Sequence, residues 1–274
     1  MNVLAIDIET YSDISLPDCG VHRYVSSELF RILLFSYSID GGEVQLADFA
    51  SGEQLPDEVM EALKDDRVIK TAFNASFERN CINAHFGLNL KPEAWRCTAV
   101  QASMLSLPLS LEGVAEALNL DKKKMSEGRE LIRYFCMPCK PTKANGGRTR
   151  NMPSDAPEKW ELFKSYCKRD VVVEMEIRDK LANFPIPERE QELYCMDQRI
   201  NDRGIMVDME LVTQAMTCDL LYKETATKRA YELSGLDNPN SVSQLKDWLN
   251  EKGIEVDSCL LYTSPSPRDP KTSR

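Results

Sequence analysis

With 274 residues, the chain is long enough for one α/β domain of medium size and a smaller second part. Its formal net charge of -10 argues against a protein that coats nucleic acid by bulk electrostatic attraction, because phosphate binding needs local Lys and Arg. Nine cysteines at irregular positions, the absence of a signal peptide and the absence of an apolar run long enough for a bilayer indicate a reduced cytoplasmic protein that does not bind a membrane.

The first two thirds of the sequence predict strands that begin as a hairpin and then alternate with helices. Residues 3–9 are apolar and β-branched, which is typical of a buried strand, and the turn Asp40-Gly41-Gly42 joins two further strand patterns. The expected elements are strands 3–9, 31–39, 43–49 and 68–73, with helices 57–64, 76–86, 111–118 and 157–181. This order predicts an α/β fold with a mixed sheet flanked by helices.

A basic loop rich in Pro and Gly interrupts the acidic sequence at residues 138–151. Its cations are Lys140, Lys143, Arg148 and Arg150. Two interpretations stay open, a solvated surface loop or a phosphate-contacting edge of a substrate channel. Cys136 and Cys139 form a CxxC pair, but neither histidine stands at metal-ligand spacing from it, so we expect no zinc site.

The pattern changes at Pro185–Pro187, where we place a domain boundary. Helices are expected at 188–201, 209–233 and 241–252. The sequence therefore divides into a domain at residues 1–185, a helical part at 186–257, and a tail at 258–274 that shifts abruptly to Ser, Pro and basic residues. This tail is similar to translated sequencing-adapter sequence, and we exclude it from the fold.

Three groups of polar residues stand out, one on a strand, one at the turn from a strand into a helix and one along a helix. Asp7 and Glu9 are two apart on a strand and so leave the same face, where they repel each other unless a cation lies between them. Glu78 falls in the first turn of a helix after a buried strand, and Tyr166 and Asp170 share one face of a long helix. Taken singly, each group is typical of an exposed acidic pair, a helix N-terminus or a helix surface.

Taken in order, Asp-x-Glu, Asn-x-x-aromatic-acid and Tyr-x-x-x-Asp resemble the three motifs of the DEDDy proofreading exonucleases, which have an RNase H-like fold. The resemblance covers about residues 1 to 182. It implies hydrolysis of phosphodiester bonds at DNA 3′ ends with two Mg²⁺ ions, for which Mn²⁺ can substitute, and without a small-molecule cofactor.

The resemblance also implies a role for each matching residue. Asp7 would bridge the two ions, Glu9 and Asp170 would complete the shell of the first, and Glu78 would hold the second largely through water. Tyr166 would orient the attacking water. Asn74 and Phe77 would line the pocket for the terminal nucleotides, and the backbone at Thr10 would contact the terminal sugar. Glu78 departs from the family, which usually has Asp there, so its reach to the second ion differs by one methylene.

Residues 188 to 256 resemble the join between exonuclease and polymerase, and the start of the thumb, in phage-type family A DNA polymerases. The matching stretches are Leu193 to Asp208 and Asn238 to Leu245. A generic helical extension is the alternative. The palm and fingers have no counterpart after residue 257, so we do not expect this chain to polymerise nucleotides.

These resemblances predict a proofreading exonuclease fragment that acts on single-stranded or frayed DNA 3′ ends in the cytoplasm of a phage-infected or bacterial host, with the remainder of a polymerase as its partner. Two alternatives are a free-standing RNA-processing exonuclease of the same superfamily and a catalytically silent module that only binds single-stranded ends. The sequence does not decide between DNA and RNA, because the pocket that accepts or rejects a 2′-OH is shaped by backbone.

Overall fold

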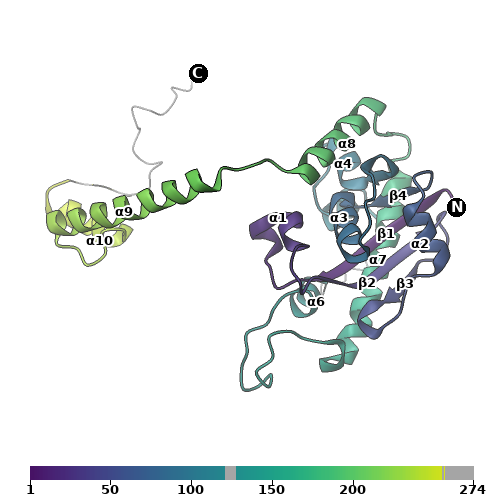
Figure 1. Cartoon of the computed structure of the whole chain (residues 1–274), viewed down its shortest axis with the longest axis horizontal. Coiled ribbons are helices and arrows are strands. Elements are labelled where there is room, and N and C mark those ends of the chain that lie inside the picture. The colour runs from purple at the N-terminus through teal and green to yellow at the C-terminus, as the bar shows by residue number, and fades with distance from the viewer. Residues whose placement is uncertain (121–127, 255, 257–274) are drawn as a thin grey trace. The chain divides into compact units, whose positions relative to one another are not determined.

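Five strands form one mixed sheet with the order β3-β2-β1-β4-β5 (Figure 1). The computed structural model describes residues 1–120, 128–254 and 256. The strands are β1 (Val3–Tyr11), β2 (Arg31–Ile39), β3 (Gln45–Asp48), β4 (Ile69–Ala72) and β5 (Trp95–Cys97). Strand β1 pairs antiparallel with β2 and parallel with β4. The α/β class and the mixed sheet expected from the RNase H-like resemblance are confirmed.

Helices cover both faces of this sheet. Leu4, Ile6 and Ile8 of β1 pack in one apolar cluster with residues of α3 (Ala75–Phe86), whereas Ala5 packs on the other face against Val171 of α7 (Pro157–Lys180). The alternation of side chains along β1 therefore directs Asp7 and Glu9 to the α7 face. Val171 is fully buried inside a helix, so tertiary packing outweighs its poor helix propensity, as expected.

The remaining helices of the first part surround this core. They are α1 (Leu16–Tyr24), α2 (Asp57–Lys64), α4 (Thr98–Met104), α5 (Leu111–Ala117), α6 (Gly128–Phe135) and α8 (Glu188–Arg203), with short 3₁₀ turns η1 (Phe49–Ser51), η2 (Pro92–Ala94) and η3 (Pro153–Asp155). Strand β5 and helices α1, α4 and α6 were not predicted. Strand β5 has only three residues, and α1 contains Gly20 at a φ of 73°, so neither carries a long periodic pattern.

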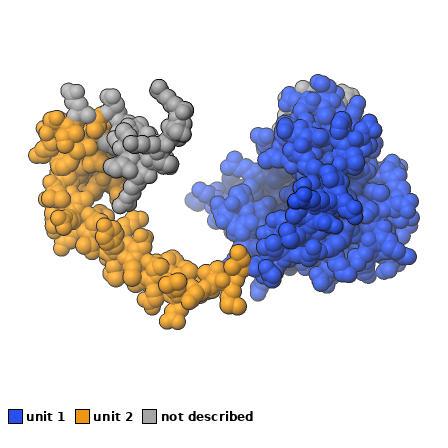
Figure 2. All heavy atoms as spheres, turned by 90° about the horizontal axis from the view of Figure 1, so that it is seen from above, with its two compact units in different colours: residues 1–204 blue, residues 205–274 orange. Residues whose placement is uncertain are grey.

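The chain divides into two compact units, residues 1–204 and 205–274 (Figure 2). Helix α8 belongs to the first unit: the Arg79 side chain, only 2% exposed, forms an ion pair of 2.8 Å with Asp202, and Gln191 Nε2 donates to the carbonyl of Trp95 at 3.1 Å. The expected boundary at Pro185–Pro187 is where α8 begins, and the compact unit continues to Gly204. That residues 1–185 fold independently remains a prediction.

The second unit contains α9 (Met209–Ser234) and α10 (Val242–Glu251), close to their expected ranges. Neither helix has a buried residue, and large apolar side chains such as Leu211, Leu220 and Leu233 are at least 60% exposed. The tail predicted at 258–274 lies outside the described residues. Across the described residues, no helix combines the length and the apolar character that a membrane span requires.

Candidate active site

Two carboxylates and a thiol meet where β1 faces α7. One ligand atom each from Asp7, Glu9 and Cys167 lie within 4.8 Å of one another. Asp7 and Glu9 stand two residues apart on β1 and share its α7 face, as the strand period predicts. Glu9 is buried and Asp7 half-buried. The Asp-x-Glu motif is thus an inward-facing pair and not a solvated strand end.

Helix α7 brings Asp170 and Tyr166 to the same region. Repulsion from Asp170 raises the pKa of both Asp7 and Glu9, after the larger effect of burial. The pKa of Asp170 itself is raised to about 7, mainly by burial, while a hydrogen bond from the Tyr166 phenol opposes this shift. Burial also raises the pKa of Tyr166, so its hydroxyl keeps its proton and can donate to Asp170.

Glu78 stands in the first turn of α3. Its side chain is 5% exposed, and its Oε2 is buried without a hydrogen-bond partner among the residues that the structure describes. Burial, with repulsion from Glu174, raises the pKa of Glu78 to about 8. Asn74 stands at the N-cap position of α3 without a side-chain capping bond. Asn74 is exposed, and its side-chain amide does not form the N-cap hydrogen bond that is the ordinary role of Asn at this position.

Asp7 interacts electrostatically with each of the other three predicted carboxyl groups. Asp170, Glu9 and Glu78 all raise the pKa of Asp7, in that order after burial. Such a set is destabilising unless it is protonated or a cation lies among its oxygens. Oxygen donors are the ligands that Mg²⁺ prefers, and the unpartnered Oε2 of Glu78 leaves a lone buried donor for such an ion. The donor set therefore fits a hard divalent cation.

Two cysteines that the sequence did not identify touch these carboxylates. Cys167 Sγ lies 3.5 Å from Asp7 Oδ2 and 3.2 Å from Ser36 Oγ, and Cys136 Sγ lies 3.7 Å from Glu9 Oε2. Cys167 stands three residues before Asp170, and this helical spacing is a signal that could have found it. Cys136 carries no comparable local signal, because the chain brings it to Glu9 from a sequence separation of 127 residues.

Gly128, at the described start of α6, also belongs to the site. A Cβ atom at this position would overlap the Tyr166 ring, coming within 2.8 Å of its Cδ2 and Cζ atoms. Only glycine allows α6 to approach Tyr166 this closely. No sequence pattern indicates this contact, since it joins two helices.

Three of the predicted substrate-binding residues, Thr10, Asn74 and Phe77, differ in exposure. Thr10 is buried, and its Oγ1 forms a hydrogen bond of 2.8 Å with the Tyr24 hydroxyl. Phe77 is partly buried, with its ring 6.2 Å from that of Tyr24. Asn74 is exposed. The Thr10 side chain is thus already hydrogen-bonded within the fold. The prediction concerns the backbone at Thr10, which would contact the terminal sugar.

The four basic loop residues do not form one patch. Lys140 and Lys143 are exposed, whereas Arg148 pairs with Asp155 at 2.8 Å and donates to Asn151 Oδ1 at 3.0 Å. Arg150 lies over the Tyr11 ring, with its guanidinium carbon 3.9 Å from the ring centroid. The four residues therefore have three different environments: Lys140 and Lys143 are exposed to solvent, Arg148 stabilises the loop, and Arg150 lies next to β1.

No family model matches the chain. A DNA polymerase of Bacillus phage SP02 is 51% identical over 258 residues, which is 94% of this chain and 40% of the phage protein. The chain thus spans about two fifths of the length of that relative. Among solved structures, Brucella melitensis NrnC is 15% identical with a TM-score of 0.38, covering 74% of this chain and 87% of NrnC. A structure titled POL domain of Pol1 from M. smegmatis is 16% identical with a TM-score of 0.48, covering 88% of this chain and 38% of that one.

Proposed function

Because this chain is a homologue of a phage DNA polymerase over part of that enzyme's length, we propose that it carries the polymerase's 3′-to-5′ proofreading exonuclease. The observation that supports the proposal most directly is the group of mutually repelling carboxylates, in which Asp7 carries repulsion from Asp170, Glu9 and Glu78. A site that concentrates negative charge in this way is suited to divalent cations and, through them, to the phosphates of a nucleic acid.

In this proposal, Asp7, Glu9, Glu78 and Asp170 would hold two Mg²⁺ ions, with Mn²⁺ as a substitute. When bound, such ions lower the pKa of an attacking water and neutralise the charge that develops on the leaving 3′ oxygen. The cysteine thiols donate weak hydrogen bonds to Asp7 and Glu9 and so help to fix their orientation.

Tyr166 acts as a neutral phenol, because burial keeps its pKa above the ordinary value. Its hydroxyl donates a hydrogen bond to Asp170, and the phenol oxygen could accept one from the attacking water. The residue thus orients water without transferring a proton. Gly128 maintains this arrangement by letting the ring occupy the space next to α6.

The proposed substrate is a single-stranded or frayed DNA 3′ end. Phe77, Asn74 and the backbone at Thr10 would contact the terminal nucleotides beside the carboxylates, and the remainder of the polymerase would deliver the strand. An RNA-processing exonuclease would use the same carboxylates, so the choice between DNA and RNA depends on the substrate test. A silent binding module is less consistent with a complete acidic set.

The test is digestion of matched DNA and RNA oligonucleotides labelled at the 5′ end, with Mg²⁺ and with chelator. We expect a ladder of DNA products that shorten from the 3′ end only when Mg²⁺ is present. Asp66→Ala, which changes an exposed acid paired with Lys91, is the matched control for substitutions in the site and should digest like the wild type. Absence of products with both substrates would contradict the proposal, and preference for RNA would favour the RNA-processing alternative.

A further inference from the structure

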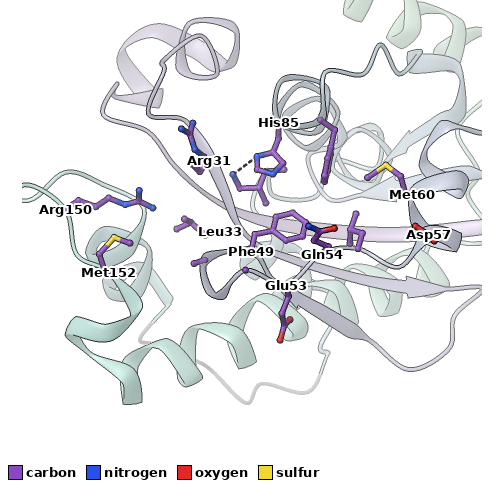
Figure 3. Close-up of a pocket in the computed structure, with 15 residues that line it drawn as sticks. Arg31, Leu33, Phe49, Glu53, Gln54, Asp57, Met60, His85, Arg150 and Met152 are labelled. Carbon is purple, nitrogen blue, oxygen red and sulfur yellow. Dashed lines mark hydrogen bonds between the residues drawn. The ribbon is translucent and has the colours of Figure 1, made fainter.

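A pocket opens beside the free edge of β2. Strand β3 pairs with β2 only from Leu34 onward, so residues Arg31 to Leu33 have β1 on one side and, as far as the structure describes the chain, no strand on the other. A cavity of about 730 Å³ lies along this edge and extends past η1 to α2 and the end of α3 (Figure 3). Its lining does not include the four carboxylates of the candidate active site.

One end of the pocket holds two arginines. The Arg31 Nη1 donates to the carbonyls of Glu28 and Phe30, at 2.8 and 2.5 Å, but forms no ion pair with a carboxylate within the described part of the chain. The Nε of Arg150 is buried and has no hydrogen-bond partner there either. Figure 3 shows the Arg150 side chain extending toward Leu33 and Arg31.

The two guanidinium groups are close enough to repel each other. Burial lowers the pKa of Arg150, and repulsion from Arg31 lowers it further, while Tyr11 opposes the shift. The acidic residues of the pocket do not relieve this repulsion. Glu53 accepts a hydrogen bond from the backbone of Asp48 at 2.8 Å, and Asp57 lies beside Met60 at the end away from Arg150 (Figure 3). Uncompensated positive charge that faces a cavity is the arrangement that binds an anion.

The middle of the pocket presents aromatic rings. Phe49 and His85 are stacked, with centroids 5.4 Å apart and an interplanar angle of 3°, and Phe86 meets both edge-on. His85 is held in place because its Nδ1 accepts the backbone N–H of Ile32 at 3.3 Å. Phe49 and His85 are both partly exposed. A planar apolar group that enters the cavity can therefore stack on them, as nucleic-acid bases do on aromatic side chains.

We propose that this pocket is a second nucleotide-binding site, in which Arg31 and Arg150 hold a phosphate and the stacked Phe49 and His85 receive a base. The inference rests on the proposed nuclease function, and it adds a contact to the bound strand away from the bond that is cut. Arg150 covers Tyr11, which is two residues beyond Glu9 on β1, so the pocket begins next to the active-site strand. The occupant is a nucleotide of the bound single strand; a free mononucleotide has the same chemistry and is the alternative that the test separates.

The experiment measures binding of the full chain in chelator, where no hydrolysis interferes. The probes are a fluorescently labelled single-stranded DNA of about 12 nucleotides, a length within the range that single-strand grooves cover, and deoxyadenosine monophosphate as a competitor. The variants are Arg31→Gln and Arg150→Gln. Arg67→Gln is the matched control, because Arg67 is a highly exposed arginine paired with Asp65 outside the pocket.

We expect each pocket variant to weaken oligonucleotide binding roughly tenfold, as loss of a charged phosphate contact should. The slope of log affinity against log salt should decrease by about 0.7 for each arginine removed. Arg67→Gln should leave both quantities unchanged. If the mononucleotide competes with the oligonucleotide, and competes less well in the same variants, the pocket also binds free nucleotides. This outcome supports the pocket as well.

The proposal is overturned if Arg31→Gln and Arg150→Gln both bind the two probes as Arg67→Gln does. Because Arg150 packs on Tyr11, thermal melting checks its variant for folding, and Arg31→Gln tests the pocket without that contact. Release of nucleotides by the wild type with Mg²⁺ is measured separately. If the wild type does not release nucleotides but the pocket variants bind more weakly, the nuclease function fails while the pocket stands; if it does and the variants bind normally, only the pocket fails.

Discussion

Burial and repulsion between carboxylates raise the pKa values of the acidic residues in the candidate site. Glu78 and Asp170 have pKa values raised to about 8 and about 7, and the pKa values of Asp7 and Glu9 are raised as well. Each carboxylate is therefore costly to the fold in the absence of a cation and useful in its presence.

Asp7→Ala should abolish nucleotide release and leave the metal-free fold as stable as before or more stable. Asp7 is repelled by Asp170, Glu9 and Glu78, so its removal relieves repulsion, while the proposed bridging ligand is lost. The expected loss of rate is on the order of a thousandfold or more. Digestion kinetics and thermal melting in chelator measure the two effects. Digestion at the wild-type rate would refute the assignment of Asp7.

Tyr166→Phe should slow hydrolysis far less than Asp170→Ala. In the proposed mechanism the phenol would orient a water, so we expect its loss to cost about tenfold in rate, whereas the carboxylate would hold a cation, so we expect its loss to cost about a hundredfold or more. Single-turnover digestion measures both rates. Equal losses would contradict these separate roles. Raising the Mg²⁺ concentration should partly restore Asp170→Ala and leave Tyr166→Phe unchanged.

Stability in chelator should fall as pH rises from 6 to 8. A carboxyl whose pKa is higher in the folded state binds its proton more tightly there than in the unfolded chain, so deprotonation between the two pKa values removes stability. The loss begins near the ordinary pKa values, 3.8 for Asp and 4.5 for Glu, and continues up to the folded-state pKa of about 7 for Asp170 and about 8 for Glu78, so it is still under way between pH 6 and pH 8. Thermal melting should give a lower midpoint at pH 8 than at pH 6, and Mg²⁺ should restore it.

Glu78→Gln provides the check on that assignment. The substitution removes the titrating group and should flatten the dependence of the melting midpoint on pH, whereas Asp66→Asn, a change at an exposed acid, should keep it. A wild-type pH dependence in Glu78→Gln would show that other groups cause the effect.

Between elements, the approach of α6 to α7 positions the Tyr166 ring. Gly128→Ala places a Cβ where the ring lies, so the ring, α6 or both must shift. We expect a loss of activity at least as large as that of Tyr166→Phe, about tenfold or more. In a Tyr166→Ala background the added methyl group meets no ring, and Gly128→Ala should then have little further effect on rate. Additive losses in the double variant would show that Gly128 acts elsewhere.

Other contacts between elements explain where the first compact unit ends. Arg79 of α3 is almost completely buried and pairs with Asp202, and it also donates to Gln198 and to the carbonyl of Leu90. These contacts bind α8 to the sheet layer. The helix is thus part of the first compact unit, although its sequence follows a Pro-rich segment that is typical of a boundary.

For the whole molecule, limited proteolysis should trim the second unit before the first. Helices α9 and α10 have no buried residue, so little apolar burial opposes their local opening. We expect rapid cleavage in this unit and a stable core that ends between residues 185 and 208, with exonuclease activity retained. Mass spectrometry of the fragments gives the end of the core, and the digestion assay gives its activity.

Two outcomes would contradict this organisation. Resistance of the second unit to cleavage would show that α9 and α10 are protected in solution, and loss of activity on trimming would show that they complete the nuclease. A core that ends near Gly204 would agree with the contacts of α8, whereas one that ends near Pro185 would agree with the boundary predicted from the sequence.

Local patterns predicted the elements that carry periodic or alternating residues. The expected helix 57–64 matches α2 at both ends, and β1, β2 and α7 lie within two residues of their expected limits. The three acidic motifs could be placed because each is short and stands at the end of a strand or along one helix. Strand β5 could not be predicted, because three residues are too few to show an alternating pattern and they form a strand only by pairing with β4.

By itself the sequence determined the α/β class and the helices and strands with strong periodicity, and it supplied the carboxylates that the proposed site uses. Only the tertiary structure decided the contacts of Cys136 with Glu9, Gly128 with Tyr166 and Arg79 with Asp202, and the pocket that Arg31 and Arg150 share. The physical reason is that secondary structure depends on neighbours three or four residues apart, whereas these contacts join residues that only packing of the whole unit brings together. The energies of these contacts depend on burial and charge in the folded unit, which a local sequence pattern does not contain.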